Sequence, residues 1–176
     1  MKIALITNSR IPSLTANSIQ AMKVAQALMQ LGHDARMFAP AETEPVSQQL
    51  LITHYGVRLI PPLELLPSIS GLKRLDFIVH AQRAAQKFGA ELIYTWLPQS
   101  AALALWMKYP VVLEMHADVT GLMGAWWLRQ FWNAKGKKTM TVTTSALRNV
   151  LERSTKLKLE NEAVIVAPNG VELERY

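Results

Sequence analysis

Apolar residues follow two spacings along the chain, one typical of buried strands and one typical of helices. Short apolar or β-branched runs predict seven strands, at 2–7, 34–38, 57–60, 91–96, 110–115, 139–143 and 163–167. Longer segments with apolar residues three and four positions apart predict the helices between them, at 17–31, 46–54, 72–88, 99–107, 122–134 and 146–156. Strands that alternate with helices form a parallel sheet with helices on both faces. We therefore predict an α/β fold, a doubly wound parallel sheet of about seven strands in three layers.

Polar residues and prolines predict where several of these elements begin or end. Asn17 follows a polar loop and Gln20 stands three residues later, so the pair predicts a capping box at the start of the first helix. Pro40 is expected to break the second strand. The prolines at 61, 62 and 67 predict an irregular loop between the third strand and the next helix.

Composition narrows the class of protein. The chain has 176 residues, the length of one domain, with half of them hydrophobic and 18% charged, which excludes a disordered chain. The absence of cysteine excludes disulfides, cysteine-ligated zinc and a thiol nucleophile. No apolar run approaches the roughly 20 residues that cross a bilayer, and residues 1–7 are typical of a first strand rather than of a signal peptide. We therefore expect a cytoplasmic location.

The chain carries a formal net charge of +6, which favours an anionic partner without identifying it. The densest cationic groups are Lys135, Lys137 and Lys138, followed by Arg148, Arg153, Lys156 and Lys158. No aromatic and basic pattern of an RNA-binding module accompanies them, so we do not predict a nucleic-acid partner. A solvated face, or attraction to phosphates and acidic lipid, fits the pattern better.

The predicted helix at 122–134 is rich in aromatic residues. Met123, Trp127 and Phe131 share one face and are expected to form its core stripe. Trp126 and Trp132 lie off that stripe, next to the group of three lysines. Packing in the core or at a domain interface is the favoured interpretation, and an interfacial contact with an anionic membrane is the alternative.

Candidate ligand-binding residues lie in the loops after the strands, because ligands of open α/β sheets bind beyond the carboxyl ends of the strands. The first of these loops contains no glycine, so the sequence has no G-x-G-x-x-G dinucleotide motif, and it has no Walker A motif either. We expect polar side chains of these loops to bind substrate, namely Asn8, Arg10, Thr15, Asn17, Trp96, Gln99, Asp118, Ser145 and Asn169.

His116 is the strongest candidate for chemistry. It ends an apolar strand and is flanked by Glu114 and Asp118, so its imidazole could donate a hydrogen bond or transfer a proton. His116 and Asp118 have no identifiable third ligand, so no metal site is predicted. The remaining histidines are expected to be structural, at His33, His54 and His80.

Four segments resemble glycosyltransferases of family 4, which have the GT-B fold. Residues 1–6 with A-L-M-Q-L-G-H-D-A at 27–35 resemble the family's first strand and the "L-x-x-x-G-H-x-V" end of its first helix. V-V-L-E-M followed by His116 is similar to its strand that ends in a cleft histidine, and T-V-T-T-S-A-L at 141–147 to its "V-x-x-S-x-x-L" step. I-V-A-P-N-G-V-E-L-E-R-Y at 165–176 is similar to "I-x-V-I-P-N-G-V-D-x-x-x-F". The chain departs from the family at 15–17, where many members have a Gly-Gly pair, and at Glu172, where Asp is usual.

The resemblance implies the N-terminal, acceptor-side half of a GT-B enzyme, a Rossmann-like domain over residues 1–176. The family's full enzymes have a second, C-terminal domain that holds the nucleotide-sugar donor, so this half alone is expected to be inactive. The implied reaction is metal-independent transfer, with retention, of a sugar to a hydroxyl acceptor, which could be lipid-linked or a polysaccharide, and no cofactor is implied. His116 would face the donor sugar, and the loops after the first and fourth strands would shape the acceptor pocket. A non-catalytic binding or membrane-docking module of the same fold is the alternative.

Overall fold

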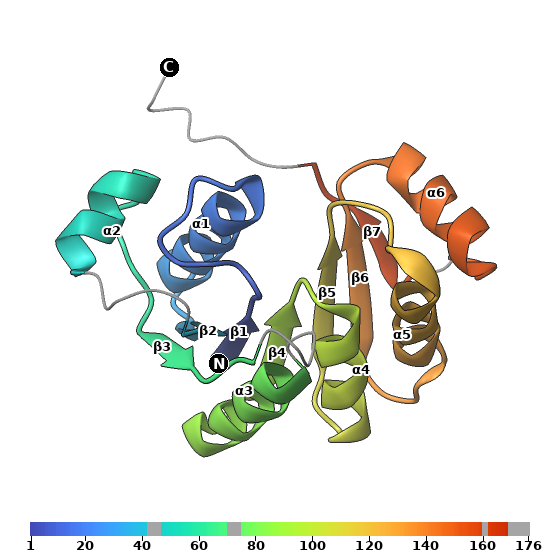
Figure 1. Ribbon diagram of the computed structural model, residues 1–176, viewed down its shortest axis with the longest axis horizontal. Coiled ribbons are helices and arrows are strands. Elements are labelled where there is room, and N and C mark those ends of the chain that lie inside the picture. Colours follow the sequence, from blue (N-terminus) through green and yellow to red (C-terminus); the bar gives the residue numbers. More distant parts are fainter. Residues whose placement is uncertain (42–46, 70–74, 160–161, 169–176) are drawn as a thin grey trace.

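Seven parallel strands lie side by side in one sheet, and helices cover both of its faces (Figure 1). The computed structural model describes residues 1–41, 47–69, 75–159 and 162–168. Within them the strands are β1 (Lys2–Ile6), β2 (Asp34–Pro40), β3 (Leu63–Leu66), β4 (Leu92–Thr95), β5 (Val111–Met115), β6 (Lys138–Val142) and β7 (Val164–Val166). The helices are α1 (Ala16–Gln30), α2 (Gln48–Tyr55), α3 (Leu75–Phe88), α4 (Pro98–Trp106), α5 (Gly121–Asn133) and α6 (Ser145–Thr155). The predicted α/β class and doubly wound sheet are therefore confirmed.

The strand order is β3-β2-β1-β4-β5-β6-β7, so the chain reverses its direction across the sheet between β1 and β4. Alternate residues of β1 face two separate cores. Leu5 packs in the core that α1 and α2 cover, whereas Ala4 and Ile6 pack in the core that α3, α4, α5 and α6 cover. Because both faces of the central strands are buried, these strands are apolar runs rather than alternating ones.

The third strand is not where the sequence predicts it. Residues 57–60 are irregular, because the backbone N–H groups of Arg58 and Leu59 donate to the side-chain oxygen of Gln26 on α1, at 2.5 and 3.2 Å. The pairing strand is β3, at the edge of the sheet, where β2 is its one partner. The prolines at 61, 62 and 67 flank β3 and do not interrupt its four residues, so the predicted loop contains a strand.

The N-cap of the first helix lies two residues earlier than predicted. This residue is Thr15, whose side-chain oxygen accepts a hydrogen bond from the backbone N–H of Ser18, at 3.4 Å. Asn17 lies inside the first turn, so the predicted capping box with Gln20 is wrong. The side chain of Gln20 instead donates to Glu114 on β5. Pro40 ends β2 as its last residue instead of breaking it earlier.

The predicted core stripe of α5 is also displaced. The buried residues are Ala125, Leu128 and Phe131, whereas Met123 is exposed and Trp127 is half-buried. Phe131 of the predicted stripe is fully buried, and Trp127 packs both against the core and against the ring of Trp106 on α4, at 6.0 Å between centroids. None of the helices formed by the described residues has the length and hydropathy that crossing a membrane requires.

The contact of Gln26 with the segment after α2 yields a stability prediction. Gln26 is buried, and its substitution Gln26→Met removes the acceptor for two backbone N–H groups while keeping the size of the side chain. We expect the free energy of unfolding to fall by about 1–3 kcal/mol, measured by urea denaturation. The control is Gln86→Met on the exposed surface of α3, for which we expect a change within about 0.5 kcal/mol. Equal effects of the two substitutions would contradict this role of Gln26.

Candidate functional site

A cleft of about 830 Å³ opens at the carboxyl ends of β1, β4 and β5, next to the place where the strand order reverses. This is where ligands bind in open α/β sheets. The loop after β1 and the first turn of α1 supply Asn8 and Asn17, and the residues after β4 supply Trp96 and Gln99. The segment after β5 supplies His116 and Asp118, and α5 supplies part of the opposite wall.

Six of the predicted site residues line this cleft, namely Asn8, Asn17, Trp96, Gln99, His116 and Asp118. Three others do not line it. The side chain of Thr15 caps α1, the backbone carbonyl of Arg10 accepts a hydrogen bond from the hydroxyl of Ser18, and Ser145 is the exposed first residue of α6. Asn169 lies outside the described residues. Whether each of these residues binds substrate stays a prediction.

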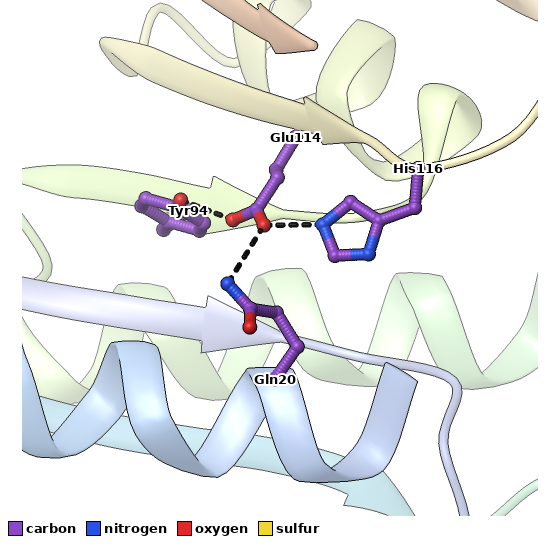
Figure 2. A network of polar contacts seen from close by, with 4 residues as sticks. All are labelled: Gln20, Tyr94, Glu114 and His116. Atoms are coloured by element: carbon purple, nitrogen blue, oxygen red, sulfur yellow. Dashed lines mark hydrogen bonds and ion pairs between the residues drawn. The ribbon is translucent and has the colours of Figure 1, made fainter. Parts of the chain in front are cut away.

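A buried carboxylate forms the centre of the polar side chains in the cleft (Figure 2). Glu114 is on β5, and its Oε1 lies in hydrogen-bond contact with Nε2 of His116 and also accepts from the side-chain amide of Gln20, at 3.4 Å. Its other oxygen, Oε2, accepts from the hydroxyl of Tyr94 on β4. Donors from α1, β4 and the end of β5 therefore converge on one carboxylate.

Strand geometry explains part of this convergence. Residues two apart in a strand point to the same face, so Glu114 and His116 lie together on the side of the sheet that α1 covers. Tyr94 pairs in register with Val112, which is two residues before Glu114, so its ring points to that same side. The ring of Trp96 packs beside that of Tyr94, at 5.2 Å between centroids, and Trp96 lines the cleft.

The environment of Glu114 favours its ionised form. Burial raises the pKa of this carboxyl, but hydrogen bonds from His116 and Tyr94, together with the charge of a protonated His116, outweigh burial and lower it. The pKa of Tyr94 is raised by burial and by the nearby charge of Glu114, so the phenol keeps its proton and remains a donor.

The ionised carboxylate also fixes the state of the imidazole. A carboxylate only accepts hydrogen bonds, so Nε2 of His116 carries a proton. The other ring nitrogen, Nδ1, points away from Glu114 (Figure 2). Nδ1 therefore accepts a hydrogen bond when the ring is neutral and donates one when the ring is protonated. His116 lines the cleft, so Nδ1 is the imidazole nitrogen that can exchange hydrogen bonds with a ligand there.

The loops around the cleft are held by side-chain hydrogen bonds. The hydroxyl of buried Thr95 donates to the carbonyl of Ile6, at 2.8 Å, and accepts from the N–H of Leu97, at 3.2 Å, which ties the end of β4 to β1. Asp118 Oδ1 accepts from the N–H of Val119, at 2.8 Å, and from the hydroxyl of Ser154 on α6, at 2.7 Å. Asp118 therefore anchors the loop between β5 and α5 to α6.

Sequence reasoning missed the two other donors to Glu114. Gln20 was assigned to a helix cap and Tyr94 to a strand interior. One signal was present for the carboxylate itself, because an acid inside the apolar run V-V-L-E-M needs compensating partners. Among the residues that the structure describes, no three His, Asp or Glu side chains are grouped to hold a metal ion.

Solved structures share this fold at low sequence identity. HepE (Alr3699) of Anabaena, in complex with UDP and glucose, is 16% identical with a TM-score of 0.65, over 100% of this chain and 46% of that one. Sucrose-phosphate synthase of Thermosynechococcus elongatus is 16% identical with a TM-score of 0.66, over 98% and 49%. UDP-GlcNAc 2-epimerase of Methanocaldococcus jannaschii, in complex with UDP-GlcNAc and UDP, is 13% identical with a TM-score of 0.64, over 94% and 46%. The chain thus spans about half the length of the structures it matches, and the likeness establishes its fold.

Sequence comparison identifies the family. No curated protein sequence matches the chain. The family model Glyco_transf_4, which describes glycosyltransferase family 4, matches residues 18–175 and therefore covers most of the chain. That range contains the cleft residues other than Asn8 and Asn17. It also contains the segments at 111–116 and 141–147 and residues 165–175 of the last segment that carries the resemblance. The resemblance is confirmed, and the chain belongs to glycosyltransferase family 4.

Proposed function

We propose that this chain is the acceptor-side half of a retaining glycosyltransferase that moves a sugar from a nucleotide-sugar donor to a hydroxyl acceptor. The observation that carries the proposal is the imidazole of His116, hydrogen-bonded to Glu114, in a cleft at the switch point of a family 4 domain. A nucleotide-sugar donor is supported by the bound UDP and glucose of HepE and the bound UDP-GlcNAc of the epimerase.

The roles divide between this half and a second domain. The chain spans about half of the proteins it matches, and in our proposal the remaining half binds the nucleotide. The acceptor side of the cleft is formed by Asn8 of the loop after β1, Asn17 of the first turn of α1 and Gln99 of the start of α4. Charge on the leaving nucleoside diphosphate is then stabilised mainly by donors of the second domain.

His116 acts on the donor sugar. In the transfer, the bond between the anomeric carbon and the donor phosphate oxygen breaks, and the acceptor oxygen bonds to that carbon while its proton passes to the leaving phosphate. Positive charge develops on the sugar ring as the donor bond breaks. Nδ1 of His116 holds a sugar hydroxyl while Nε2 remains bonded to Glu114. The carboxylate orients the ring and compensates any positive charge on it, which makes Glu114 a positioning residue.

The fold by itself does not select transfer over other sugar chemistry, because the epimerase shares it. Membership of family 4 favours transfer, and identifying the reaction product distinguishes transfer from epimerisation. A radiolabelled sugar that moves to an acceptor supports the proposal, whereas a changed sugar that stays on the nucleotide would support epimerisation. A chain that binds nucleotide-sugar without turnover would be a binding module.

The role of His116 is testable in the full-length enzyme. We expect His116→Ala to lower kcat about 100-fold to 1,000-fold, because one interaction made in the transition state is lost. The melting temperature should fall moderately, because the buried carboxylate of Glu114 loses one of its three donors, so turnover is compared at a temperature at which both proteins are folded. The matched control is His80→Ala on the exposed surface of α3, which should leave turnover unchanged. Wild-type turnover in His116→Ala would remove His116 from the mechanism.

The role of Glu114 predicts a pH dependence of stability. Its lowered folded-state pKa means that ionisation stabilises the fold above the ordinary carboxyl range and that this contribution is lost as the pH falls through the folded pKa. We expect Glu114→Gln to be less stable than the wild type at neutral pH, with the difference shrinking as the pH falls below about 4. Urea denaturation across this pH range measures the effect.

The matched control for that series is Glu64→Gln on the exposed face of β3, for which the difference should not depend on pH in this way. Glu114→Gln should also lower kcat more than it raises KM, because the imidazole loses its orientation while the cleft keeps its shape. A pH-independent stability difference for Glu114→Gln would contradict an ionised Glu114.

The division of roles predicts that residues 1–176 alone show no transfer and bind donor weakly. The reason is that the nucleotide contacts are assigned to the second domain. Isothermal titration with UDP-sugars, compared with the full-length enzyme, measures this difference. Tight donor binding by the 176-residue chain would contradict the division.

A further inference from the structure

Large apolar side chains gather on the outer face of α4 and α5. On α5, Leu122 is 92% exposed, Met123 59% and Trp126 43%, and Trp106 at the end of α4 is 50% exposed. The half-buried ring of Trp127 joins them, at 4.6 Å from the ring of Trp126 and 6.0 Å from that of Trp106. These five residues form a continuous aromatic and apolar strip, which we call the α4–α5 strip. Monomeric proteins rarely expose such a contiguous patch without a partner.

Helices α4 and α5 contain no acidic residue, and basic residues follow both of them. No Asp or Glu occurs between Glu91 and Glu114, which includes α4, or between Asp118 and Glu152, which includes α5. Lys108 follows α4, and Lys135 and Lys137 follow α5, all three exposed. Gly136, between the last two, lies against Leu105, where a Cβ atom would be 3.1 Å from the leucine side chain. The three lysines are therefore brought to the end of the strip that carries Trp106.

A neighbouring lysine is excluded from this set. Lys138 donates from its half-buried ammonium to the carbonyls of Trp132 and Ala134, at 2.5 Å each, and so caps the end of α5. Burial lowers the pKa of Lys138. Of the three lysines grouped together in the sequence, two are available at the surface and one is structural.

We propose that the α4–α5 strip, with Lys108, Lys135 and Lys137, docks this domain onto the surface of an anionic phospholipid bilayer. Tryptophans favour the headgroup level of a membrane, and exposed lysines favour its anionic lipids. A second copy of the chain fits the face less well, because the lysines of one copy would meet a face whose helices α4 and α5 contain no acid to pair them.

The proposal goes beyond the proposed transfer and does not depend on it. It has one consequence for the site, because Met123 and Trp127 belong to both the strip and the wall of the cleft. Docking would therefore place the mouth of the cleft beside the headgroups.

Vesicle co-sedimentation of the full-length protein tests the proposal. The probe is vesicles of phosphatidylcholine and phosphatidylglycerol in equal parts, compared with phosphatidylcholine alone. We expect binding to the anionic vesicles at low salt, which weakens as salt screens the lysines, and much weaker binding to the neutral ones. Absence of sedimentation with anionic vesicles at low salt would overturn the proposal.

Two pairs of variants locate the contact. The double variant Lys135→Gln with Lys137→Gln should lower the partition coefficient onto anionic vesicles about thirtyfold, since each lysine contributes about fivefold near an anionic surface. The control, Arg83→Gln with Lys87→Gln on the exposed surface of α3, removes the same charge elsewhere and should have a smaller effect. Trp126→Ala should weaken binding about tenfold or more, whereas Leu50→Ala on exposed α2 should not.

Other occupants of the strip give different results. Equal loss in the two lysine pairs would mean that overall charge, and not this face, attracts the vesicles, and would overturn the proposal. Self-association in the absence of vesicles, abolished by Trp126→Ala, would identify a second copy as the occupant and would overturn it as well. Neither Trp126 nor the two lysines line the cleft, so transfer measured with a water-soluble acceptor should persist in these variants.

Discussion

The buried carboxylate of Glu114 is the constraint on which the geometry of the cleft depends. An ionised carboxyl that is only 8% exposed costs several kcal/mol unless hydrogen bonds replace the lost water. Here Gln20, Tyr94 and His116 supply those bonds from α1, β4 and the end of β5. The three donors must be in place together, so the carboxylate sets how α1 packs over the sheet at its switch point. The orientation of the imidazole follows from the same requirement.

Hydrogen bonds at the carboxyl ends of the strands hold the backbone that carries this network. Buried Thr95 bridges β1 and β4 at the switch point through hydrogen bonds to the backbones of Ile6 and Leu97. Small side chains in α4 then let that helix lie close to the sheet and to α5, since Ala101 and Ala104 are fully buried. The cleft is therefore built on parts of the chain whose backbone groups are paired and whose side chains are packed, which is the arrangement that preorganises a site.

The central part of the fold could be predicted because its strands are buried on both faces and therefore appear as apolar runs. The edge strand could not, since β3 has one strand partner and its residues resemble a loop between prolines. The decisive contact, from Gln26 to the backbone at 58 and 59, joins segments about thirty residues apart and has no local signal. The N-cap was misplaced because Thr15 and Asn17 are both good caps and local sequence does not choose between them.

For the candidate site, the sequence was enough to associate His116 with Glu114, because both lie at the end of one apolar strand. It did not predict Tyr94 or Gln20, since the pairing of β4 with β5 and the packing of α1 are tertiary. Arg10 and Thr15 were expected in the cleft because they belong to its loop. That loop instead folds back on α1, where Thr15 caps the helix and the carbonyl of Arg10 meets Ser18.

Helix α5 has three different faces, and their separation determines how the surface and the site can influence each other. Leu128 and Phe131 pack in the core, Gly124 and Trp127 line the cleft, and Trp126 faces solvent. Trp127 contacts the rings of both Trp126 and Trp106, so an occupant of the α4–α5 strip would reach the cleft through this side chain. The Glu114 network lies on the opposite side of the cleft, on the sheet and α1. An occupant of the strip would therefore act on the shape of the α5 wall and leave the paired imidazole in place.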